Sequence, residues 1–116
     1  MKELNLPHQE PLKFARYIVS KDDILAVVKV QFNEIPTLPM LVEAAAQSSA
    51  AFDDGDEQVG FLVTLKNIKL LNKPIALEYD IKVIFEYQLD SLTYFKFEVY
   101  DKDIAVSNGI FIIALQ

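Results

Sequence analysis

The stretch Thr37-Leu38-Pro39-Met40-Leu41-Val42-Glu43-Ala44-Ala45-Ala46-Gln47-Ser48-Ser49-Ala50-Ala51-Phe52 decides the fold of this chain. A surface helix carries a polar face opposite its apolar stripe, whereas this stretch is apolar or small almost all round. Thr37 and the proline two residues later are typical of a helix start, and Asp53-Asp54-Gly55 indicates its end. The sequence therefore predicts one buried helix with almost no solvent-facing side. The polar residues after its first turn are Glu43, Gln47, Ser48 and Ser49.

Glu43 is the one ionisable residue of the predicted helix. A buried carboxylate is costly unless it is paired, hydrogen-bonded or protonated. Gln47 follows one turn later on the same face, so the two side chains can bond each other. Two interpretations stay open, a structural Glu-Gln pair or interface carboxylate and a general acid or base.

Composition restricts the class of protein. A chain of 116 residues predicts one domain, 1–116, and a hydrophobic fraction of 52% favours an oligomer, since an interface resembles a divided core. The absence of cysteine excludes disulfides and thiolate chemistry and makes a cytoplasmic location the default expectation. No apolar run reaches the roughly 18 residues of a membrane span, and the first residues lack the apolar core of a signal peptide.

Charge argues against nucleic acid as a partner, because the net charge is −6 and no basic cluster with interleaved aromatics is present. Docking of an acidic carrier protein would need a local basic patch, for which Lys66, Lys69 and Lys73 are the candidates. The acidic segment Asp53-Asp54-Gly55-Asp56-Glu57 lacks the ligand spacing of a calcium loop and reads as a solvated loop. We expect no metal and no cofactor.

Strand patterns surround the helix. The runs before it form a predicted hairpin, and those after it are separated by short turns and predict an antiparallel meander. In the fifth run Phe95, Phe97 and Val99 share a face that is suited to the core. The predicted strands are Leu12 to Ser20, Ile24 to Phe32, Val59 to Leu71, Ile75 to Tyr87, Ser91 to Tyr100 and Ile104 to Leu115.

A single long helix among such strands must be wrapped by their sheet, which predicts an α+β roll. Before the first long strand, Leu6-Pro7-His8-Gln9-Glu10-Pro11 predicts an ordered turn, because two prolines interrupt it. His8 is the only histidine of the chain. It is either a structural hydrogen-bonding group or a catalytic one.

Three of these stretches resemble the hot-dog fold family, and in particular its 3-hydroxyacyl-acyl-carrier-protein dehydratase-like branch. The opening turn through Arg16 is similar to a Leu-Pro-His-Arg-x-Pro segment that ends in Asp-Arg, although Ala15 replaces the Asp. Pro39 through Gln47 is similar to a central helix with a Glu-Ala-x-Ala-Gln core. Gly60 through Lys69 looks like the strand that lines an acyl tunnel.

The resemblance implies a curved antiparallel sheet around the helix and a homodimer, or a dimer of dimers, with an acyl-thioester site at the subunit interface. Glu43 would be the helix carboxylate that helps the 3-hydroxyl leave as water, and His8 is the candidate for a second catalytic group. The thioester would be carried by acyl carrier protein or coenzyme A in lipid metabolism. The substrate-binding candidates are Pro39, Met40, Gln47, Phe61, Leu62 and Val63.

The chain departs from the dehydratase pattern just before the helix. Dehydratases carry Gly-His-Phe-Pro-Gly-His-Pro there, whereas residues 33–39 contain no histidine. The shortened approach from Leu38 to Glu43 is closer to dehydratase-like proteins of aryl-polyene pathways. Three functions stay open, namely a dehydratase-like lyase, an acyl thioesterase that uses Glu43 alone, and a non-catalytic thioester binder or structural dimer.

Overall fold

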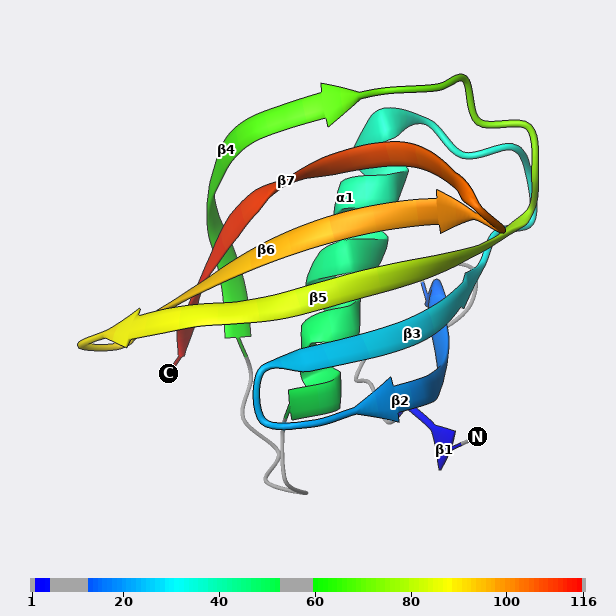
Figure 1. Ribbon diagram of the computed structural model, residues 1–116. Coiled ribbons are helices and arrows are strands. Elements are labelled where there is room, and N and C mark those ends of the chain that lie inside the picture. Colours follow the sequence, from blue (N-terminus) through cyan, green and yellow to red (C-terminus); the bar gives the residue numbers. More distant parts are fainter. Residues whose placement is uncertain (1, 5–12, 53–59, 116) are drawn as a thin grey trace.

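The computed structural model describes residues 2–4, 13–52 and 60–115, and in this part of the chain one antiparallel sheet wraps one helix (Figure 1). The α+β class predicted from the sequence is confirmed. Along the sheet the strands follow the order β1-β2-β3-β5-β6-β7-β4. The elements are β1 Lys2–Glu3, β2 Ala15–Lys21, β3 Leu25–Gln31, α1 Leu38–Ser48, the 3₁₀ helix Ser49–Phe52, β4 Gly60–Leu70, β5 Glu78–Leu89, β6 Leu92–Asp101 and β7 Ile104–Leu115.

Helix α1 begins where the sequence predicts. Thr37 is its N-cap, and the hydroxyl Oγ1 of this residue accepts a hydrogen bond from the backbone N–H of Met40 at 3.4 Å, which satisfies one of the unpaired N–H groups of the first turn. The expectation of almost no solvent-facing side is wrong in one respect. Pro39 is exposed and Glu43 is only half-buried, because the sheet covers α1 from one side and leaves this stripe open.

The core lies between α1 and the concave face of the sheet. Strands β3, β5 and β6 alternate between buried and more exposed residues where the helix covers them, as expected when one face of a sheet is covered. The predicted core face of β6 is confirmed. Phe95, Phe97 and Val99 belong to the same buried cluster as the small helix residues Ala44 and Ala45. The central buried side chains are Val28, Val30, Leu41, Ala44, Ala45, Ile81, Val83, Phe95, Phe97, Val99 and Phe111.

The strand order corrects the predicted meander. Strands β5, β6 and β7 do follow one another, but β4 pairs with β7, and β5 pairs with β3 instead of β4. Strand β5 carries a fully buried row and is stabilised by neighbours on both sides, whereas the side chains of β4 are largely exposed. The connection through the helix therefore leads from β3 to β4 at the far edge of the sheet. The loop of residues 71–77 leads from β4 back to β5, which lies beside β3.

Strand β4 bends twice along its pairing with β7. The register shifts between Leu62 and Thr64 and again between Lys66 and Lys69, so each time β4 has one residue more than its partner. Such β-bulges bend a strand and re-aim its side chains. In Figure 1 β4 accordingly curves around one side of α1, and its end lies over the start of the helix.

The hairpin of β2 and β3 closes at the predicted turn. The carboxylate of Asp22 accepts hydrogen bonds from the backbone N–H groups of Leu25 and Ile24 at 2.7 and 2.8 Å. These bonds, that from Leu25 first, lower the pKa of Asp22 because they favour the ionised form. The two-residue β1 has no counterpart in the sequence prediction, and the predicted turn of residues 6–11 lies outside the described residues.

The packing of α1 predicts a large cost for truncating Leu41, which is fully buried. Leu41→Ala should lower the free energy of unfolding by about 2–5 kcal/mol, because apolar contacts are lost and a cavity remains. Leu89→Ala is the matched control, since Leu89 is 57% exposed and should change stability by less than about 0.5 kcal/mol. Urea unfolding measures both, and similar midpoints for the two variants would contradict this packing.

Candidate functional site

An apolar groove of about 300 Å³ lies between the first turns of α1 and strand β4. Among the described residues that line it, Glu43 is the only ionisable one. The groove residues are Leu38, Pro39, Val42 and Glu43 from the helix and Leu62, Leu65 and Ile68 from the strand. A concave apolar surface with one polar group is the usual form of a small-molecule site, in which the polar group orients the ligand.

The side chain of Gln47 forms a hydrogen bond with Glu43 and orients its carboxylate. Gln47 is 3% exposed, and its carbonyl Oε1 accepts hydrogen bonds from the backbone N–H groups of Phe14 at 2.8 Å and Ala15 at 3.2 Å. Because the carbonyl end is occupied by two donors, the amide Nε2 faces the other way and donates to Glu43 Oε1 at 3.3 Å. The predicted Glu-Gln pair is therefore present in the structure.

These hydrogen bonds set the orientation of the Glu43 carboxylate and therefore the chemistry that is open to it. The carboxylate is half-buried at an apolar groove, and one of its oxygens faces the donor on Gln47. A carboxylate in such a position can take up or deliver a proton at a ligand in the groove. Both interpretations of Glu43 stay open, because the carboxylate lies at the groove and its hydrogen bond to Gln47 also stabilises the link between α1 and β2.

The predicted substrate-binding residues fall into three positions. Pro39 and Leu62 line the groove, and Gln47 lies behind it. Met40 lies on α1 and is half-buried, outside the lining. The neighbours of Leu62 on β4, residues 61 and 63, are about half exposed and also outside the lining. Contacts of Met40, Phe61 and Val63 with a ligand stay predictions.

Strict alternation of residues along β4 does not predict that Leu65 and Ile68 line the groove. A regular strand turns every second residue to one face, but the two bulges of β4 turn residues 62, 65 and 68 to the groove instead. One signal in the sequence was available. Asn67 has a positive φ of 55°, and asparagine is one of the few residues that adopt this conformation readily, so an asparagine within a strand can mark a bulge.

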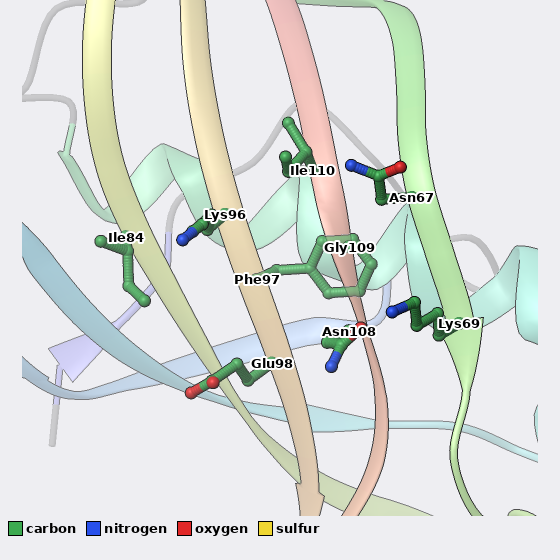
Figure 2. Close-up of a pocket in the computed structure, with 9 residues that line it drawn as sticks. All are labelled: Asn67, Lys69, Ile84, Lys96, Phe97, Glu98, Asn108, Gly109 and Ile110. Carbon is green, nitrogen blue, oxygen red and sulfur yellow. The ribbon is translucent and has the colours of Figure 1, made fainter.

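A second hollow of about 350 Å³ lies on the outer face of the sheet, across β5, β6, β7 and β4 (Figure 2). The charged residues of its lining are Lys69, Lys96 and Glu98. Lys96 also approaches Glu86, with Nζ and Oε1 3.5 Å apart, and Glu98 Oε1 accepts a hydrogen bond from the hydroxyl of Tyr100 at 3.2 Å. We assign no function to this shallow surface.

The remaining predicted groups are placed as follows. His8 and the acidic segment 53–57 lie outside the described residues. Within the described ranges no three His, Cys, Asp or Glu side chains lie close enough to hold a metal ion. In the same ranges no helix is long and apolar enough to cross a membrane. Lys66, Lys69 and Lys73 are all exposed, the first two on β4.

Comparison with known proteins identifies the fold. No family model matches the sequence, and no curated protein matches it either. Among solved structures, a chain of the dehydratase heterocomplex ApeI:P from Xenorhabdus doucetiae is similar, with a TM-score of 0.81 and 13% identity over 96% of this chain and 88% of that one. An HP0420 homologue from Helicobacter felis has a TM-score of 0.71 and 17% identity, with 95% and 82% of the two chains covered.

A hypothetical thioesterase protein from Streptococcus pneumoniae TIGR4, solved with coenzyme A, gives a TM-score of 0.68 and 14% identity over 86% of this chain and 84% of that one. At such identities the likeness concerns the fold alone. These neighbours are hot-dog proteins, and the described sheet and helix match them. The chain has the hot-dog fold that its sequence resemblance implies.

The bonds of Gln47 predict that its carbonyl matters for stability. Gln47→Leu keeps an apolar stem but leaves the buried N–H groups of Phe14 and Ala15 without their acceptor. Each unsatisfied group costs about 1–3 kcal/mol, so the free energy of unfolding should fall by at least about 2 kcal/mol.

Glu43→Gln is the control for the Gln47 variant, because it leaves both backbone bonds of Gln47 intact. Its unfolding free energy should stay within about 1 kcal/mol of the parent chain. Chemical denaturation compares the three proteins. Equal stability of Gln47→Leu and the parent would mean that these backbone groups find other partners.

Proposed function

We propose that this protein binds acyl thioesters in the groove between α1 and β4 and interconverts 3-hydroxyacyl and 2-enoyl thioesters, as a dehydratase-like lyase. The observation that carries the proposal is Glu43, a half-buried carboxylate oriented by Gln47 at the wall of an otherwise apolar groove. An acyl chain matches the apolar walls, and the reacting carbons next to the thioester would lie beside the carboxyl group.

In the proposed reaction Glu43 would carry out the acid step. Elimination breaks the C2–H bond and the C3–O bond, forms the C2=C3 double bond and releases water. Glu43 in its acid form would donate a proton to the departing 3-hydroxyl, and backbone N–H groups at the start of α1 would polarise the thioester carbonyl. His8, the only histidine of the chain, is our candidate for the base that removes the C2 proton.

Two comparisons support this choice of substrate. The chain is similar in fold to a dehydratase heterocomplex and to a hypothetical thioesterase protein that was solved with coenzyme A. Acyl carrier protein or coenzyme A would therefore present the thioester here too. The proposed reaction would belong to lipid metabolism and take place in the cytoplasm. Exposed Lys66 and Lys69 on β4 are candidates for contact with an acidic carrier.

A thioesterase is the second candidate, because Glu43 is the only ionisable residue among the described residues of the groove lining and residues 33–39 contain no histidine. One carboxylate that activates water or attacks the carbonyl is sufficient for the hydrolysis of a thioester. The third possibility from the sequence is a binder that holds the thioester unchanged. All three share the groove and differ in the product.

We also propose that two copies of the chain join through β4. The two edges of the sheet differ, since β1 has two exposed, charged residues, whereas β4 has eleven residues and a series of exposed apolar side chains. A long apolar edge readily pairs with another strand, while a short charged edge does not. A partner strand on β4 would also close the groove, which is open along this strand. The exposed apolar side chains of β4 are Phe61, Leu62, Val63, Leu65 and Leu70.

A charge on the β4 edge should separate the subunits. Val63 is 50% exposed and lies outside the groove lining, so Val63→Lys should leave the monomer fold intact and oppose strand pairing. Light scattering at micromolar concentration should give a dimer mass for the parent and a monomer mass for this variant. Ile24→Lys at the β2–β3 turn, 59% exposed, should remain dimeric. A monomeric parent would refute the pairing.

The reaction is tested by incubating the protein with a 3-hydroxyacyl carrier protein and, separately, with its 2-enoyl form, and by following the intact mass. We expect loss or gain of one water, and Glu43→Gln should abolish it. Glu86→Gln, an exposed glutamate on β5, should retain full activity. A large loss of rate in His8→Ala would assign His8 to catalysis.

Other products would overturn the lyase assignment. Release of the acyl group from the carrier, lost in Glu43→Gln, would make the protein a thioesterase. An acyl carrier that binds but keeps its mass would make it a non-catalytic binder.

A further inference from the structure

Ile68 is the deepest of the three strand residues in the groove. Leu62 and Leu65 are 38% and 46% exposed, whereas Ile68 is half-buried and packs against the hydrophobic core. The exposed pair therefore lies toward the open side of the groove. Ile68 lies where the groove meets the core.

A glycine directly behind Ile68 makes room for it. A Cβ atom built on Gly109 would collide with Cδ1 of Ile68 and would approach Cε1 of Phe97 to 2.9 Å. Figure 2 shows the Phe97 ring beside Gly109, with Asn67 on the neighbouring strand. The absent side chain of Gly109 thus forms a notch, which the tip of Ile68 fills.

The second bulge of β4 turns Ile68 into this notch. Lys66 pairs with Ile110 and Lys69 with Asn108, so Asn67 and Ile68 together face Gly109. The left-handed conformation of Asn67 allows the extra residue, and Ile68 turns inward. Because its tip occupies the space beside Gly109, which the ring of the fully buried Phe97 also approaches, Ile68 cannot move deeper without displacing core side chains.

We propose that Ile68 is the floor of the groove and sets the length of the apolar chain that the protein accepts, with Gly109 setting the depth at which Ile68 lies. The inference rests on the proposed acyl-binding groove and identifies its specificity-determining residue. A shorter side chain at 68 would extend the groove toward Gly109 and Phe97. A side chain at 109 would push Ile68 into the groove and shorten it.

Straight-chain alkan-1-ols of increasing length test the floor without a carrier or catalysis. Their affinity is measured from chemical-shift changes of the backbone amides of β4. Each methylene buried in an apolar site strengthens binding by about fourfold, until the chain reaches the floor. For the parent protein we expect the affinity to rise by this factor with each added methylene and then to level off at a defined chain length.

The variants should move the length at which affinity levels off. Ile68→Ala should shift it by about two carbons to longer chains, because the side chain beyond Cβ is removed. Gly109→Ala should shift it to shorter chains. Leu65→Ala is the matched control, since it removes a residue of the open side and should weaken all chains without moving the limit.

The double variant Ile68→Ala/Gly109→Ala is included in case either single variant fails to fold. In it the new methyl group at position 109 occupies space that the Ile68 side chain vacates, so neither a clash nor a large cavity remains. The limit of the double variant should lie between those of the single variants. Ile68→Val should give a smaller shift in the direction of Ile68→Ala. An unchanged limit in every variant would overturn the role of Ile68 while leaving the groove in place. Failure of the parent to bind any alkanol would contradict the proposed groove itself.

Discussion

The burial of α1 in the concave face of the sheet is the constraint on which the rest of the structure depends. Alanines at 44 and 45 let the strands approach the helix backbone, and larger side chains such as Leu41 fill the space to native density. With no second α-helix among the described residues, the sheet itself must curve to cover this one. The curvature leaves one stripe of α1 open, and Glu43 lies on that stripe.

The same helix connects stability with chemistry through Gln47. Its buried carbonyl completes the hydrogen bonding of two backbone groups at the start of β2, and this fixes the direction of its amide toward Glu43. A glutamine bound in this way has little freedom to rotate, because rotation would leave three partners unsatisfied. The carboxylate at the groove is thus oriented by a contact that the fold needs for its own reasons.

Strand β4 serves two requirements that affect each other. It is an exposed edge with apolar side chains, which favours pairing with another strand, and it is also one wall of the groove. Its two bulges turn residues 62, 65 and 68 toward α1 and leave Phe61 and Val63 outside the lining. Different residues of β4 therefore contribute to the groove and to the exposed edge. Under the proposed pairing through β4, subunit association and closure of the groove would be one event.

The sequence by itself determined the local elements. The apolar and small residues predicted the helix, Thr37 with the early proline predicted its start, and residue spacing predicted the alternation of β6 and the shared face of Glu43 and Gln47, because each of these depends on neighbours a few residues away. The resemblance to the hot-dog family implied the roll that the structure has. These features made up most of the fold and the central pair of the site.

Only the tertiary structure decided the order of the strands and the walls of the groove. The position of β5 beside β3 depends on which row of side chains the helix covers, and that choice involves segments far apart in the chain. The inward turn of Ile68 needs the notch at Gly109, about forty residues later, and Gln47 finds its donors at Phe14 and Ala15. Periodicity is a local property, whereas these contacts come from long-range packing and from the need to satisfy buried backbone groups.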